Sequence, residues 1–213
     1  MKITKLEHSG CVVEKDGKKI VCDPVEFEAV LPELKNVAAV VLTHKHADHF
    51  QPEQIATIVD LNPEVRIFAP VDIETSEIAG RPVEQVEAGV ELDVEGFNLE
   101  FFGHDHAAII PGKIPCRNIG VVIDDIFVDP GDAFDFPEGV EAEVLLVPSA
   151  APWCKVEDGM QYIRAVKPKM VIPAHNAVLS ELGNGYNNNW LRMACEEVGA
   201  EFAPLNIGES VEV

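Results

Sequence analysis

Basic residues are scarce in this sequence. Among its 213 residues, 16 are Lys or Arg and 37 are Asp or Glu, which gives a formal net charge of −21. A surface this acidic repels phosphate backbones and anionic lipid headgroups, so the composition disfavours general nucleic-acid binding and binding to membrane surfaces. A local basic patch could still override this average.

Cysteine pairs and long apolar runs are also missing. The five cysteines are odd in number, widely spaced and without a CxxC pair: Cys11, Cys22, Cys116, Cys154 and Cys195. This pattern argues against a disulfide framework and against a cysteine-rich zinc site, so we expect reduced thiols in the core of a cytoplasmic protein. Residues 1–7 carry charges throughout and lack the apolar run of a signal peptide. No stretch approaches the ~20 apolar residues that a membrane-spanning helix needs.

The apolar residues that are present predict two rounds of strands, each followed by a β-α-β unit. Hydrophobic residues make up 47% of the chain, which is ample for a core. Strands are predicted at 11–13, 19–22, 37–42, 65–69, 90–94, 97–101, 119–123, 126–129, 144–147 and 170–173, and helices from Pro52 onward, over 156–166 and over 190–198. Two sheets packed face to face with helices outside satisfy this order, so we expect an α/β fold with halves at roughly 1–85 and 86–213.

Histidines are concentrated in one short segment. Three of the seven lie within six residues, at His44, His46 and His49, with Asp48 among them. The segment follows the predicted strand at 37–42, and alternate side chains of an extended backbone point to the same side. One loop can therefore offer two imidazoles to one cation, and Asp48 and His49 to a second. Imidazole and carboxylate ligands suit zinc, manganese or iron, so we predict a metal centre here rather than a polar loop with chance histidines.

The run from residue 44 to 49 resembles the HxHxDH motif of the metallo-β-lactamase superfamily. Further segments resemble other parts of that family in the same order along the chain: 6–10, 21–24, 103–107, 129–132 and 172–175. Within the superfamily the sequence is most similar to the compact metal-dependent hydrolases that include the ascorbate-6-phosphate lactonase-like group. The resemblance implies a single domain over 1–213, folded as a four-layered α/β/β/α sandwich with its site at one edge of the two sheets.

The resemblance also implies a set of metal ligands. Two metals would share seven side chains, with His44, His46 and His106 on the first, Asp48, His49 and His175 on the second, and Asp132 between them. His104 offers a second imidazole in the 103–107 loop. We prefer His106 because the family histidine is followed by a small residue, here Ala107. Redox di-iron members carry glutamate where this chain has His46, so electron transfer is disfavoured.

Several other residues are candidates for the surroundings of the metals. His8 lies in an opening turn that approaches the site in this family, although a purely structural histidine fits equally well. Asp23 resembles the buried aspartate that orients ligand imidazoles, and an ordinary Asp-Pro turn is the alternative. Trp153 and Lys155 follow a predicted strand and could line the pocket, Lys155 by holding a substrate anion or else simply as an exposed lysine. His104 belongs to this group if His106 is the ligand.

The function implied is a binuclear metal-dependent hydrolase. A hydroxide shared by two divalent metal ions, most simply Zn²⁺ with Mn²⁺ or Fe²⁺ as alternatives, would attack a small ester, lactone or phosphoester, and Asp48 would bind one metal and orient the hydroxide. Two alternatives stay open: a non-catalytic, metal-binding regulatory scaffold, and a phosphodiesterase or nuclease of the same superfamily. We expect a small-molecule substrate and neither a membrane nor a nucleic-acid partner, and we leave a homo-oligomer open.

Overall fold

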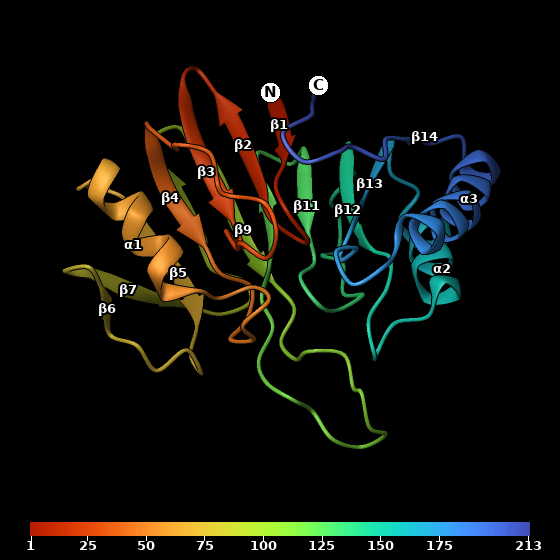
Figure 1. Cartoon of the computed structure of the whole chain (residues 1–213), viewed down its shortest axis with the longest axis horizontal. Helices are drawn as coiled ribbons and strands as arrows, with labels where there is room; N and C mark the ends of the chain where they lie inside the picture. The colour runs from red at the N-terminus through yellow and green to blue at the C-terminus, as the bar shows by residue number, and fades with distance from the viewer.

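Two β-sheets face each other at the centre of the computed structural model, which describes residues 1–213 (Figure 1). The first sheet has the order β15-β1-β2-β3-β4-β5-β7-β6. Its strands are β1 (Lys2–Lys5), β2 (Cys11–Lys15), β3 (Lys18–Cys22), β4 (Val37–Val41), β5 (Arg66–Pro70), β6 (Glu77–Ile78), β7 (Arg81–Val86) and β15 (Ser210–Glu212). The second sheet has the order β14-β13-β12-β11-β10-β9-β8. Its strands are β8 (Glu91–Val94), β9 (Phe97–Phe102), β10 (Gly120–Ile123), β11 (Phe127–Asp129), β12 (Val144–Pro148), β13 (Met170–Ala174) and β14 (Glu201–Phe202).

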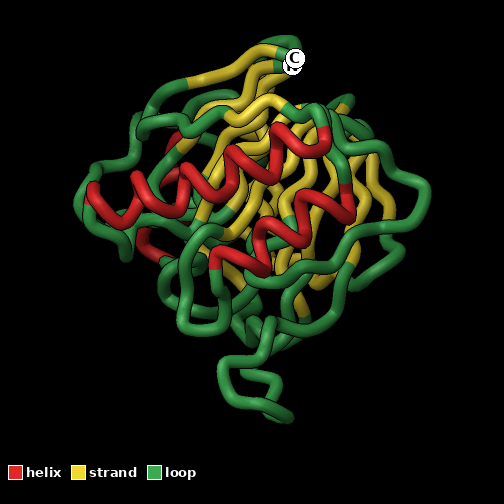
Figure 2. Tube along the Cα trace, turned by 90° about the vertical axis from the view of Figure 1, so that its right-hand side faces the viewer, coloured by secondary structure: helices red, strands yellow, loops and turns green.

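Helices cover the outer faces of both sheets. Helix α1 (Pro52–Leu61) packs on the first sheet, and α2 (Val156–Val166) and α3 (Glu181–Val198) lie side by side across the second (Figure 2). The side-chain period of two in a strand explains how one strand serves two cores. In β10, Val121 and Ile123 enter the core between the sheets, whereas Val122 enters the core under α2 and α3. Three apolar layers therefore separate four structural layers, which confirms the α/β/β/α sandwich.

The ends of several strands meet at one edge of the sandwich. Strands β3, β4 and β5 are parallel, and β1 has the same direction as β3 because both are antiparallel to β2. In the second sheet, β11, β12 and β13 are parallel, and β9 has the same direction as β11 because both are antiparallel to β10. The loops that follow these strands lie opposite the two chain termini, on the side from which the 103–118 segment projects (Figure 1). Ligands of α/β folds bind at such carboxyl edges.

Most predicted elements are present, and the differences have local causes. Asp16 and Gly17 take positive φ angles of 52° and 77° in the turn between β2 and β3, as the predicted hairpin requires. Helix α3 begins at Glu181, well before the predicted start at residue 190, because Ser180 caps it by accepting a hydrogen bond from Gly183 N–H. Glycines and asparagines in its first half weaken the helical pattern of the sequence. None of the helices combines the length and apolar character that a membrane span requires.

Candidate metal centre

The predicted ligands come from loops at the shared edge of the two sheets. His44 follows β4, and Asp48 and His49 lie in the turn before α1. From the second sheet, His106 follows β9, Asp132 follows β11 and His175 directly follows β13. Sequence positions more than a hundred residues apart therefore converge because the strands that carry them run in one direction.

Two groups of ligand-type side chains form at this edge. One contains His44, His46, His106 and Asp132; the other contains His8, Asp48, His49 and His175. Within each group the candidate ligand atoms lie within 4.8 Å of one another. The structure thus brings together all seven residues proposed from the sequence as ligands, and adds His8 beside them.

Asp132 lies between the two groups. Its Oδ1 is 3.1 Å from Nε2 of His49, and its Oδ2 is 3.1 Å from Nε2 of His175. The same Oδ2 is 3.3 Å from Nε2 of His106 and 3.8 Å from Nε2 of His44. One carboxylate therefore faces imidazoles of both groups, which is the position that a bridging ligand needs.

Hydrogen bonds at Nδ1 fix the ring orientations of three histidines. Nδ1 of His49 faces Asp23 Oδ2, Nδ1 of His106 faces the Ala107 carbonyl and Nδ1 of His175 faces the Ala150 carbonyl, each at 2.6 Å. Because these oxygens can only accept, each Nδ1 carries a hydrogen and each Nε2 presents a lone pair toward Asp132 when the ring is neutral. This is the tautomer that a metal-binding histidine uses.

Buried polar atoms without partners are gathered at the same place. Nε2 of His44, His49, His106 and His175, and Oδ1 of Asp132, are buried and make no hydrogen bond. Buried polar groups are otherwise almost always paired, so a group of orphaned atoms requires an explanation. Lone pairs of imidazole nitrogen and carboxylate oxygen that face each other at about 3 Å need a proton or a cation between them. The donor set therefore fits divalent metal ions.

When no cation is bound, protons on some of the histidines supply the positive charge that faces Asp132. Burial disfavours a charged His175, but Asp132 and Asp48 outweigh it and raise the pKa of His175 to about 9. Burial likewise opposes the charge on His49, yet Asp132 and Asp23 raise its pKa well above the usual value. Burial would raise the pKa of Asp132, but His49, His106 and His175 more than offset it and hold that pKa well below its usual range. Asp132 thus favours a positive charge on His49 and His175, whereas burial and the neighbouring His49 lower the pKa of His44 well below its usual value.

The other predicted site residues divide into two sets. Asp23 accepts hydrogen bonds from His49 Nδ1 at 2.6 Å and from the Thr43 backbone and hydroxyl, and Trp153 Nε1–H donates to Asp132 Oδ2 at 3.1 Å. His104 lies outside the cluster, with 68% of its side chain exposed and paired with Arg117 and Asp105. Lys155 is exposed at the start of α2, where its backbone N–H donates to Asp158, so it does not line the cluster.

Two positions that sequence reasoning missed complete the site. Thr43 Oγ1 donates to Asp23 Oδ2 at 2.6 Å and lies 3.1 Å from His44 Nδ1, so it links the Asp23 carboxylate to the imidazole of His44. Asn118 Oδ1 accepts from Asp132 N–H at 2.9 Å, and its amide donates to the Pro130 carbonyl at 2.8 Å. At Gly131, φ is 61° and any Cβ would clash with Asn118 and Thr43, so glycine is required there. The Gly-Asp pair was the signal in the sequence; its partner Asn118 had none.

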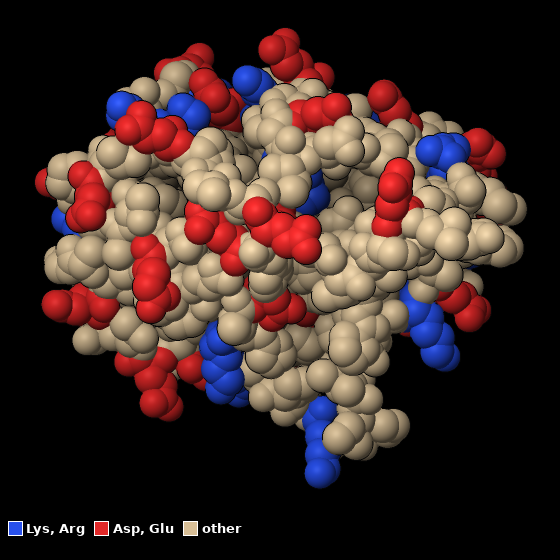
Figure 3. Space-filling model, in the orientation of Figure 1, with Lys and Arg blue, Asp and Glu red and all other residues tan.

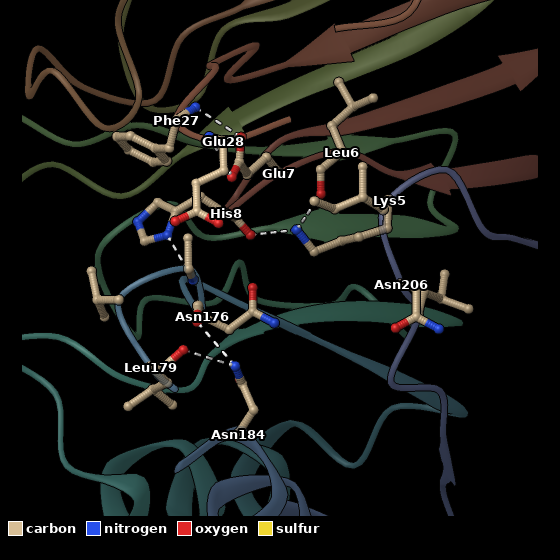
Figure 4. A pocket seen from close by; sticks show the side chains of 14 residues that line it. Lys5, Leu6, Glu7, His8, Phe27, Glu28, Asn176, Leu179, Asn184 and Asn206 are labelled. Atoms are coloured by element: carbon tan, nitrogen blue, oxygen red, sulfur yellow. Dashed lines mark hydrogen bonds between the residues drawn. The ribbon is translucent and has the colours of Figure 1, made fainter. Parts of the chain in front are cut away.

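A cavity of about 410 Å³ adjoins the second group. It is lined by residues from the first turn, from the segment after β13 and from the C-terminal loop, and it includes His8 and Asn176 (Figure 4). His8 thus belongs to both the cavity wall and the group formed with Asp48, His49 and His175.

Comparisons with known proteins agree with this architecture. A family model described as the beta-lactamase superfamily domain matches residues 2–175. The chain belongs to the metallo-β-lactamase superfamily. Among curated proteins, Protein Rv0786c of Mycobacterium tuberculosis is 30% identical over 190 residues, which cover 87% of this chain and 88% of that protein.

Solved structures share the fold of this chain at low sequence identity. Igni18, a metallo hydrolase from the archaeon Ignicoccus hospitalis, superposes with a TM-score of 0.76 at 21% identity and covers 99% of this chain and 97% of its own. CmlA, a diiron β-hydroxylase from Streptomyces venezuelae, superposes with a TM-score of 0.73 at 12% identity and covers all of this chain but 54% of its own. One fold carries different chemistries, so the function of this member has to be argued from its own side chains.

Proposed function

We propose that this protein is a binuclear metal-dependent hydrolase that acts on a small ester, lactone or phosphoester. The observation that carries the proposal is the buried cluster in which four histidine Nε2 atoms face one carboxylate without hydrogen-bond partners. A fold that bound no metal would gain nothing by keeping these atoms unpaired. His46, in place of a glutamate, favours hydrolysis over redox chemistry at this site.

Seven side chains would hold the metals. His44, His46 and His106 would bind one cation, Asp48, His49 and His175 the other, and Asp132 both. When bound, two divalent cations, most simply Zn²⁺ with Mn²⁺ or Fe²⁺ as alternatives, supply Lewis acidity and lower the pKa of water to about 7.

The exposed side of the cluster is where a substrate would enter. His46 and Asp48 are only partly buried, whereas His44, His49, His106, Asp132 and His175 are buried. The carboxylate of Asp48, whose side chain is 35% exposed, can therefore accept a hydrogen bond from the attacking water and orient it. Trp153 donates its indole N–H to Asp132 Oδ2 and so helps to hold that carboxylate in place.

The charge of the surface supports a small substrate over a polymer. Acidic side chains are spread over the visible face and basic ones are fewer and scattered (Figure 3). A nucleic acid would meet this repulsion along its whole length, whereas a small ester meets only the site. All five cysteines are free and buried, which is consistent with a reducing cytoplasm.

Metal content and turnover measured on the same samples test this proposal. The metal-free protein would be reconstituted with zinc, analysed for zinc per chain, and assayed on 4-nitrophenyl acetate, a γ-lactone, bis(4-nitrophenyl) phosphate and single-stranded DNA. We expect two zinc ions per chain and turnover of at least one small substrate. Two zinc ions without any turnover would favour the regulatory scaffold, preferential cleavage of DNA would favour a nuclease, and fewer than one zinc ion per chain would reject the binuclear site.

A further inference from the structure

His8 is the one member of the two ligand groups that the metal assignment does not use. Its side chain is 1% exposed, and its Nε2 lies 3.5 Å from Asp48 Oδ2 without forming a hydrogen bond. Its ring centroid is 3.9 Å from that of His175. This position permits two roles: a further metal ligand, or a hydrogen-bond donor beside the metals.

The partner of Nδ1 distinguishes these roles. Behind the rings of His49, His106 and His175, Nδ1 faces an oxygen, so the hydrogen resides on Nδ1 and Nε2 is free to bind a metal. Behind the ring of His8, Nδ1 faces the backbone N–H of Ala177 at 3.3 Å (Figure 4). A backbone N–H can only donate, so Nδ1 of His8 is the acceptor and its hydrogen resides on Nε2.

The first turn holds this ring in place. His8 has a φ of 55°, a left-handed conformation that is uncommon for a residue with a Cβ. Its carbonyl accepts a hydrogen bond from the buried Lys5 ammonium (Figure 4). The same carbonyl also accepts from the His175 backbone N–H. The Glu7 carboxylate accepts backbone N–H groups of residues 27–29, and the Phe27 ring packs edge-on against His8 with centroids 5.4 Å apart. The turn therefore fixes both the position and the direction of Nε2–H.

We propose that His8 is not a metal ligand but a catalytic hydrogen-bond donor, whose Nε2–H binds the substrate oxygen that becomes negatively charged during hydrolysis. This inference rests on the proposed hydrolase function. Trp153, which also directs an N–H into the cluster, already donates to Asp132. The nearest acceptor to the donor of His8 is Asp48 Oδ2, at 3.5 Å, and no hydrogen bond forms at that distance. An oxyanion from an ester, lactone or phosphoester is an acceptor that matches it.

Nitrogen-15 NMR of the histidine rings tests the tautomer directly. Two-bond ¹H–¹⁵N correlation spectra would be recorded on the full chain labelled at histidine, zinc-loaded and metal-free, and the His8 signals assigned from those missing in His8→Gln. We expect the zinc-loaded spectrum to show a hydrogen on Nε2 of His8 and hydrogens on Nδ1 of His49, His106 and His175. A zinc-shifted Nε2 and a hydrogen on Nδ1 of His8 would overturn the proposal, whether or not a substrate is known.

Metal titration and kinetics of His8 variants provide a second test of this proposal. His8→Ala and His8→Gln should both bind two zinc ions with affinities within about threefold of wild type, measured by chelator competition. On the best substrate of the panel, the loss of one oxyanion donor should lower kcat on the order of 10²-fold in His8→Ala with a smaller change in KM. Gln, which keeps an N–H at the end of a side chain of similar reach, should recover part of kcat. His104→Gln, whose ring lies outside the cluster, is the matched control and should behave as wild type.

The outcomes separate this inference from the proposed function. A wild-type protein that cannot bind two zinc ions would reject the binuclear hydrolase itself. A wild type that binds two, with His8→Ala losing one of them, would show that His8 is a ligand and reject only the inference. Retention of full kcat in His8→Ala would also reject it.

Discussion

Replacing Asp23 by Asn should disable one metal position without changing any proposed ligand. Asp23 is fully buried and accepts hydrogen bonds from Thr43 N–H at 2.9 Å, from the Thr43 hydroxyl at 2.6 Å and from His49 Nδ1 at 2.6 Å. Asn has one acceptor oxygen and one donor amide, so it can satisfy only part of this set. With its oxygen on Thr43, its amide faces His49 Nδ1, and the His49 hydrogen must then move to Nε2. Nε2 of His49 would no longer present a lone pair.

The size of the effect follows from this loss of orientation. Removal of an outer-sphere partner of a ligand histidine typically costs 10–100-fold in metal affinity, which is about 1.4–2.7 kcal/mol. The metal-free chain also loses hydrogen bonds to a charged group, worth about 1.5–3 kcal/mol each. We therefore expect a folded Asp23→Asn variant with one zinc bound as tightly as in wild type and the second bound 10–100-fold more weakly.

Competition with a chromophoric chelator would resolve the two affinities, and urea denaturation of the metal-free chain would measure the stability. Asp129→Asn is the matched control. Asp129 is also buried at this edge, but its carboxylate accepts only from Gly131 N–H, at 2.9 Å, and does not touch a ligand ring. This control should retain both zinc affinities within about threefold. Two wild-type affinities in Asp23→Asn would refute the argument that Asp23 fixes the His49 tautomer.

Three further predictions concern the cluster itself. Asp132→Asn removes the charge that both groups share, so we expect a folded protein with fewer than two zinc ions per chain by elemental analysis and turnover lower on the order of 10²-fold; full zinc content and turnover would contradict a bridging role. His106→Ala should lose zinc while His104→Ala keeps it, and the opposite pattern in the same analysis would reverse the assignment of the 103–107 loop. The pKa of His175 is raised from 6.5 to about 9 in the metal-free chain, so its protonation stabilises that chain fully below pH 6.5 and this contribution disappears as the pH rises through about 9. Urea denaturation between pH 6 and 10 should therefore show a decline in the metal-free wild type that is weaker in His175→Gln, and equal pH profiles for the two proteins would exclude this linkage.

Most of the fold could be predicted because its signals are local. The apolar run of β4, the Asp16-Gly17 turn and the proline at the start of α1 each specify their element without help from the rest of the chain. β15 could not be predicted in the same way. It is a three-residue strand without buried residues, and its place is set by pairing with β1 at the other end of the chain. β7 was likewise hidden in an acidic stretch, because its only buried residue is Val86.

The site could be predicted only as far as its ligands share a motif. His44, His46, Asp48 and His49 lie together in the sequence, so their spacing alone predicts that they bind metal. His106 and His175 required the family resemblance, because nothing local separates them from other histidines. Thr43 and Asn118 gave no signal, since their roles arise from hydrogen bonds to Asp23 and Asp132 that exist only after the sheets have packed.

The backbone conformation of the site explains how the chain keeps the lone pairs of the histidine Nε2 atoms close to those of the Asp132 carboxylate. Three residues that contribute to the cluster, His8, Asp23 and His175, have positive φ angles of 55°, 43° and 54°. Each follows the last residue of a strand closely, so the chain turns sharply and directs a side chain across the edge of the sheet instead of along it. Such conformations cost on the order of 1–3 kcal/mol each and persist only where the surroundings determine them. Here the surroundings are the two sheets, which bury the flanking strands on both faces. A cluster made by flexible loops would relax until its lone pairs separated, whereas this one is held at the distances that a shared cation would bridge.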